Sequence, residues 1–95
     1  MIHISQRAQG STTLHIFLEG TLDHEHVVAL QEVIREADEQ KISRLVLHCS
    51  GLLGIDDSGT EFLQEIEHRG ARLLDLPVAV SWKLRSTDRQ PQRRA

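Results

Sequence analysis

The chain has 95 residues, a net charge of −3 and hydrophobic residues at 39% of its positions, which is the composition of one soluble globular domain. Aromatic residues make up only 3%, so aliphatic side chains must form the core, and the acidic balance argues against a nucleic-acid binder. The single cysteine, Cys49, excludes an internal disulfide and fits a reducing, cytoplasmic compartment, and no apolar run is long enough for a signal peptide or a membrane span.

The first half of the chain predicts two strands, a helix and a third strand. Apolar and polar residues alternate over residues 1–5 and 13–18, and the polar segment between them predicts an antiparallel hairpin. Asp23 is a favourable N-cap for an amphipathic helix that ends near residue 39. The short apolar run at residues 45–47 predicts a strand in the centre of the sheet.

The next segment predicts a loop and a second helix. Residues 49–55 contain two glycines and no regular period, so we expect a loop there. The second helix begins near Ser58. We predict that it continues through Gly70, because the apolar stripe stays in phase up to Leu74; a helix that ends at Gly70 is the alternative.

The end of the chain predicts one more strand and a tail. Residues 78–82 alternate again. Residues 85–95 are polar and basic, so we expect a disordered tail after a folded domain that spans residues 1–84. Strands that alternate with helices predict an α/β fold, a mixed sheet of about four strands with its helices packed on one face.

The candidate site lies where the central strand leads into the second helix. Asp56, Asp57 and Ser58 occupy this position, and open α/β sheets carry their functional sites at the carboxyl ends of their strands. The N-terminus of a helix favours negative charge, so it could hold a phosphate on Ser58. Ser58 and Glu61 also have the spacing of a capping box, and the local sequence favours that structural role, which does not exclude the other.

Over roughly residues 14–82 the sequence resembles the STAS domain of anti-sigma factor antagonists. The match consists of a Gly-x-Leu-Asp block at residues 20–23, a helix, an apolar strand and an Asp-x-Ser-Gly block at residues 56–59. The resemblance implies a regulatory protein-interaction module in which a partner kinase, itself an anti-sigma factor, phosphorylates Ser58. The unphosphorylated domain would bind this partner, and phosphorylation would release it. By the same resemblance, the partner-binding residues are Asp23, Asp56, Asp57, Ser58, Gly59 and Thr60.

Two features differ from the family pattern. Asp57 places a charge where the family often has a small residue or a hydroxyl, and the polar C-terminus is not expected to supply the packed helix that usually follows. A second copy of the chain, as a homodimer, or another protein would then cover a bare sheet face. One alternative function is therefore a regulatory subunit of a lipid or sulfate transporter, which would dock through the same loop without phosphorylation. Another is a module that binds an anion or a nucleotide.

Neither an enzyme nor a metal protein is expected. Asp23, His24 and His26 are close in sequence, but neighbouring helical positions do not converge on one ion. The remaining histidines are scattered over His3, His15, His48 and His68. The chain has no nucleophile elbow and no phosphate-binding glycine loop, and Cys49 has no ordered histidine and aspartate partners in the sequence, so we expect no cofactor.

Overall fold

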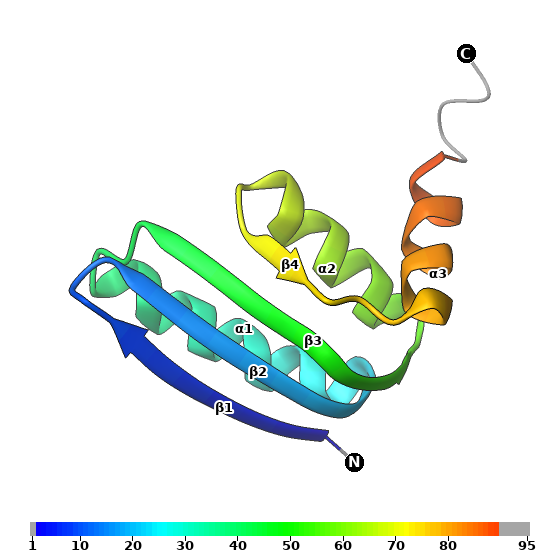
Figure 1. Ribbon diagram of the computed structural model, residues 1–95, viewed down its shortest axis with the longest axis horizontal. Coiled ribbons are helices and arrows are strands. Elements are labelled where there is room, and N and C mark those ends of the chain that lie inside the picture. The colour runs from blue at the N-terminus through cyan, green and yellow to red at the C-terminus, as the bar shows by residue number, and fades with distance from the viewer. Residues whose placement is uncertain (1, 90–95) are drawn as a thin grey trace.

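The computed structural model describes residues 2–89 and shows a four-stranded sheet packed against helices (Figure 1). The elements in chain order are β1 (Ile2–Gln9), β2 (Thr13–Leu22), α1 (His24–Glu39), β3 (Arg44–Ile55), α2 (Asp57–His68), β4 (Arg72–Leu74) and α3 (Val78–Arg89). The strands lie in the order β1-β2-β3-β4. β1 pairs antiparallel with β2, and β3 pairs parallel with both β2 and β4. The predicted mixed sheet with an antiparallel edge strand and a central third strand is confirmed.

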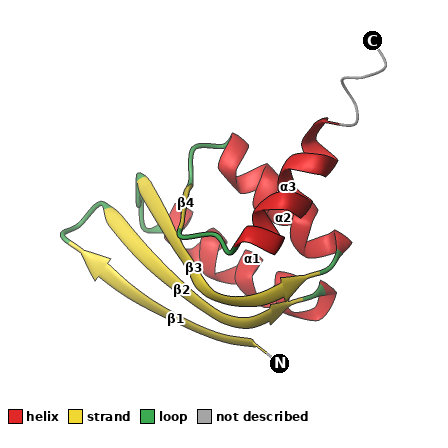
Figure 2. Ribbon diagram, turned by 45° about the vertical axis from the view of Figure 1, so that its right-hand side comes forward, coloured by secondary structure: helices red, strands yellow, loops and turns green. Residues whose placement is uncertain are grey.

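The hydrophobic core lies between one face of the sheet and the helices (Figure 2). Alternation along β2 puts Leu14, Ile16 and Leu18 on this face, where each is buried. The helices contribute buried aliphatic residues at helical spacing, as expected of amphipathic helices that cover a sheet. These core residues are Val27, Leu30, Ile34 and Ala37 of α1, Phe62, Leu63 and Ile66 of α2, and Val80 and Leu84 of α3.

The loop expected over residues 49–55 is in fact strand, because β3 continues to Ile55 and pairs with β2 along most of its length. Gly51 explains the wrong prediction. A Cβ at this position would lie 2.7 Å from the Cγ of Glu19 and 2.9 Å from the carbonyl oxygen of Leu18. The glycine therefore permits a close approach of two strands, where the pairing register also shifts, and does not mark a loop.

The predicted continuation of the second helix through Gly70 is wrong, and the alternative is correct. α2 ends at His68, and Gly70 has a φ of +110°, which a helix does not accommodate. The chain then turns into the three-residue strand β4, which is the fourth strand of the sheet in place of residues 78–82. The apolar residues Leu73 and Leu74 thus belong to a strand that forms only beside β3.

The last strand and the bare face expected at the C-terminus are replaced by α3. Val80 and Leu84, four residues apart, are both buried in the core, and the Gln64 side chain donates a hydrogen bond of 2.7 Å to the carbonyl oxygen of Leu84. The predicted absence of a packed C-terminal helix is therefore wrong. The expected boundary after residue 84 falls inside α3, which continues to Arg89; the rest of the expected tail, residues 90–95, lies outside the described residues.

Candidate functional site

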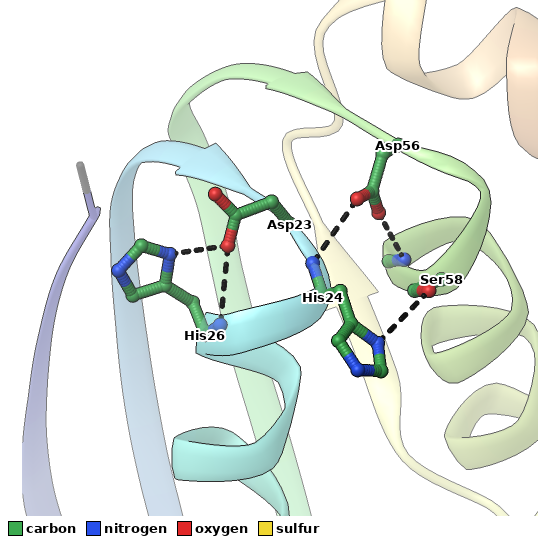
Figure 3. Close-up of polar contacts among 6 residues, drawn as sticks. Asp23, His24, His26, Asp56 and Ser58 are labelled. Atoms are coloured by element: carbon green, nitrogen blue, oxygen red, sulfur yellow. Dashed lines mark hydrogen bonds and ion pairs between the residues drawn. The ribbon is translucent and has the colours of Figure 1, made fainter.

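The candidate site lies at the edge of the sheet where β2 and β3 end side by side. Leu22 and Ile55 form the last pair of this parallel ladder, and each is followed by one aspartate and then by a helix. Because neighbouring parallel strands end at the same edge, the N-termini of α1 and α2 come together there (Figure 3). Both helix ends favour negative charge at this edge.

Asp56 connects the two helix N-termini. One of its carboxylate oxygens accepts a hydrogen bond of 2.8 Å from the backbone N–H of Gly59, so Asp56 is the N-cap of α2. The other accepts one of 3.0 Å from the backbone N–H of His24, at the start of α1. The predicted capping box of Ser58 is therefore wrong, because Ser58 is the second residue of the helix and Asp56 already fills the cap position.

Asp23 caps α1, as predicted. Its Oδ1 accepts a hydrogen bond of 3.1 Å from the backbone N–H of His26 and lies 2.5 Å from the Nδ1 atom of the same residue. These contacts, with the backbone hydrogen bond the strongest, lower the pKa of Asp23 below its ordinary value of 3.8. Asp23 is thus a fixed negative charge at neutral pH.

Ser58 lies partly exposed on the first turn of α2. Its hydroxyl oxygen is 3.3 Å from the Nδ1 atom of His24 (Figure 3). Next to it, the side chain of Asp57 is 97% exposed, with the Nζ atom of Lys83 3.5 Å from its Oδ1. The hydroxyl is therefore reachable from solvent, with an imidazole on one side and an exposed carboxylate on the other.

Two of the six predicted partner-binding residues lie beneath the surface. Gly59 is buried against the end of β2, where an added Cβ would lie 2.7 Å from the carbonyl oxygen of Leu22. Thr60 is 1% exposed, and its hydroxyl donates a hydrogen bond of 2.9 Å to the carbonyl oxygen of Asp56. Gly59 thus permits close packing of α2 against β2, and the Thr60 side chain bonds to the backbone of the cap residue Asp56. The four that reach the surface together are Asp23, Asp56, Asp57 and Ser58.

Several residues of this region were missed by the sequence interpretation. His24 touches Ser58, and Lys83 of α3 lies beside Asp57. Large apolar side chains are also exposed on the bordering elements, since Leu53 near the end of β3 is 83% exposed and Trp82 on α3 is 72% exposed. The Asp-His pair that opens α1 was a visible signal for His24. For Lys83 the signal was ambiguous, because the alternation over residues 78–82 predicts a strand where the structure has α3.

The other candidates for chemistry lie away from this site. Burial raises the pKa of the Cys49 thiol to about 12, with a further contribution from the Asp75 carboxylate, so the thiol is protonated and unreactive in the folded chain. Among the side chains described for residues 2–85, no group of three or more histidines, cysteines or acidic residues is arranged to hold a metal ion. Within residues 2–89, no helix has the length and apolar character needed to cross a bilayer.

Comparison with known proteins supplies a family. The family model described as STAS domain matches residues 4–74. Among solved structures, the anti-sigma factor antagonist SpoIIAA in its unphosphorylated form aligns with a TM-score of 0.73 at 21% identity, over 94% of this chain and 84% of the other. An uncharacterised protein with a SpoIIAA-like fold from Shewanella loihica aligns with a TM-score of 0.58 at 14% identity, over 92% and 76%. No curated protein sequence matches.

Proposed function

Since the chain belongs to the STAS domain family, we propose that it is a regulatory protein-interaction module that is switched by phosphorylation of Ser58. In this proposal it acts in transcription regulation: it binds a serine kinase that is also an anti-sigma factor, and phosphorylation ends the complex. The observation that supports the proposal is the partly exposed Ser58 hydroxyl at the junction of two helix N-termini. The module itself catalyses no reaction, and the single, buried Cys49 fits a cytoplasmic location.

The electrostatics of this junction favour a switch. A phosphate on Ser58 would add a charge of about −1.5 to −2 at neutral pH. It would lie in the same helical turn as Asp57 and next to the capping carboxylate of Asp56. His24 is within contact distance of the hydroxyl and is available to pair with part of the new charge. The rest would lie beside the module's own Asp56 and Asp57 carboxylates, and enclosing these charges together in an interface would cost like-charge repulsion and desolvation, so modification should weaken binding and leave the fold intact.

The elements that border the site also carry side chains suited to a protein interface. Leu53 near the end of β3 and Trp82 on α3 are exposed and offer apolar contacts, while Asp57 and Ser58 offer polar ones. Interfaces take most of their binding free energy from a few anchor residues, among which Trp, Tyr and Arg are enriched, surrounded by a polar rim. A partner with an apolar, positively charged surface matches this combination.

The test is a comparison of Ser58 variants at matched stability. The tagged chain is used to capture proteins from the native cell, which are identified by mass spectrometry together with any phosphate on Ser58. The Ser58→Asp variant should fold and lose the captured kinase by tenfold or more, whereas Ser58→Ala should retain it and resist release by ATP. Ser11→Asp, at an exposed position in the hairpin turn, is the matched control and should bind as the parent does.

A second function is favoured by one observation, the 97% exposed carboxylate of Asp57 directly before Ser58. A permanent charge at this position suits a docking surface that does not need a phosphate, such as that of a regulatory subunit of a lipid or sulfate transporter. In that case Ser58→Asp would bind its partner as tightly as the parent, and no phosphate would be found on Ser58. The captured partner would then be a transporter component.

A further inference from the structure

We propose that the face of the sheet opposite the helices binds a short, extended, acidic segment of a partner protein. This inference does not depend on Ser58 or on its phosphorylation. In Figure 2 the helices lie on one side of the sheet. Because side chains alternate along a strand, the residues between the core residues point to the other side. His15 and Phe17 of β2 and His48 of β3 occupy the middle of this open face.

The aromatic rings of the open face are held in a fixed arrangement. Phe17 stacks on His48 with the ring centroids 4.3 Å apart. The Nδ1 atom of His15 lies 2.8 Å from the Nε2 atom of His48. The Nε2 atom of His15 lies 2.7 Å from the side-chain amide oxygen of Gln9. The guanidinium carbon of Arg7 is 5.7 Å from the centre of the Phe17 ring. The face is thus preorganised, which lowers the entropic cost of binding a ligand.

The open face also gathers the three arginines that, among the side chains described for residues 2–85, have no carboxylate partner. The strand register places Arg7 opposite His15, Arg44 opposite Thr13, and Arg72 opposite Val46, so all three belong to this face. Within residues 2–85 every side-chain ion pair lies on a helix or its cap, and none includes a strand arginine. Glu19 is the only acidic residue on a described strand; it shares this face with Phe17 but lies at the other end, beside Gly51. The end of the face that holds Arg44 and Arg72 is therefore basic in a chain that is acidic overall.

A groove of about 490 Å³ is lined by two of these arginines, Arg44 and Arg72. Its lining is Gln9, Gly10, Thr13, His15, Arg44, Val46, Arg72 and Leu74. Val46 and Leu74 make its floor apolar, Arg44 and Arg72 supply positive charge, and no acidic side chain lines it. The groove between α1 and α2 is different, since its arginines Arg35 and Arg69 are already paired with glutamates of their own helices.

The dimensions and chemistry favour an acidic peptide. Unpaired guanidinium groups bind carboxylates in a planar, bidentate geometry. Four strands at a spacing of about 4.8 Å span roughly 14 Å, the length of about four extended residues. The apolar floor would accept one aliphatic side chain between the carboxylates. Stacking of nucleic-acid bases is disfavoured, because the Phe17 ring already contacts His48 and Arg7.

An amide-detected NMR titration of the full chain tests the proposal. The probe is the peptide acetyl-Glu-Glu-Leu-Glu-Glu-amide, and the same peptide with glutamine in place of glutamate is its control. We expect the acidic probe to shift the signals of Val46, Arg72 and Leu74 at millimolar concentration or below, and the effect to disappear at about 0.5 M salt, where charges are screened within a few ångström. Arg72→Glu should weaken binding at least tenfold, whereas Arg35→Glu on α1 should not.

Three results would overturn the proposal: equal shifts with the glutamine peptide, unchanged binding by Arg72→Glu, or shifts confined to the helices. If oligouridylate or inorganic phosphate shifts the same signals and binds as tightly as the acidic peptide, the face is a nucleic-acid or general anion site instead. Because β4 is only three residues long, the amide spectrum of Arg72→Glu must first show an intact sheet. If it does not, Arg44→Glu at the start of β3 provides the same test.

Discussion

The helices α1 and α2 begin in almost the same way, yet different contacts stabilise their first turns. Each follows a strand through one capping aspartate, Asp23 or Asp56. At the third helical position α1 carries His26, whose ring turns back to its own cap. The corresponding Gly59 of α2 is pressed against the end of β2, and Asp56 also bonds to the backbone of α1. The cap of α1 is thus formed by residues of its own first turn, with one further hydrogen bond from Asp56, whereas the start of α2 also depends on packing against β2.

Among substitutions that test this difference between the two helix starts, Gly59→Ala should reduce stability the most. The new Cβ would lie 2.7 Å from the carbonyl oxygen of Leu22, a backbone atom that cannot move without shifting β2. We expect the free energy of unfolding in urea to fall by about 1–3 kcal/mol. Gly54→Ala is the control, because nothing lies within 4 Å of its added Cβ, and it should change stability by less than ~1 kcal/mol. Equal effects of the two substitutions would show that α2 is not wedged against β2.

Asp56→Ala should have the next largest effect. It removes the cap of α2 and leaves the backbone N–H of His24 without its acceptor, which should cost about 1–2 kcal/mol. Amide exchange should accelerate in the first turns of both helices, whereas Asp23→Ala should accelerate it in α1 alone. Asp56→Asn keeps one acceptor oxygen and should lose less. If Asp56→Ala affects only α2, the two helix starts are not coupled.

Lowering the pH should have a smaller effect on stability, through the Asp23 carboxylate. The pKa of Asp23 is below 3.8 in the folded chain because of its hydrogen bonds with His26. A lowered folded-state pKa contributes stability that is fully present above the unfolded value of 3.8 and is lost as the pH falls through the folded pKa. The stability difference between the parent and Asp23→Asn should therefore shrink as the pH falls below ~4. A difference that persists unchanged at pH ~2 would contradict this role of the charge.

The smallest effect is expected from Ser58→Ala. Ser58 is the second residue of α2 and its hydroxyl caps nothing, so the substitution should change the free energy of unfolding by no more than ~0.5 kcal/mol. A loss of ~1 kcal/mol, typical of a removed N-cap, would mean that the hydroxyl takes over the cap in solution. Thermal melts of the two proteins decide this, and a small value also makes Ser58→Ala a clean reagent for binding studies.

The first half of the fold could be predicted from the sequence because its signals are local. The hairpin alternates with period two, and α1 has a cap, a stripe of apolar residues and a clear end. The position of the site at the end of the central strand followed from the same reasoning and from the Asp-x-Ser-Gly block. What remained hidden was the contact between Asp56 and His24, which are 32 positions apart and meet only after β2 and β3 pair.

The second half of the fold was less predictable because the spacing of its apolar residues fits both a strand and a helix. Val78, Val80 and Trp82 alternate as in a strand, but Val80 and Leu84 are also four residues apart, and these two are the buried ones. Only the presence of α2 decides between the two, since α3 packs against it. Leu73 and Leu74 were ambiguous in the same way: the left-handed backbone at Gly70 separates them from α2 and leaves them to β3.

The enclosed thiol of Cys49 makes the chain a reporter of its own opening. The side chain is 0% exposed and its pKa is about 12, so a maleimide at neutral pH modifies only molecules that have transiently opened around β3. The labelling rate then counts opening events and not surface reactivity. A partner that binds the closed form lowers the open population by mass action. Slower labelling of this one sulfur in a cell extract would therefore reveal an unknown partner before anything about that partner is known.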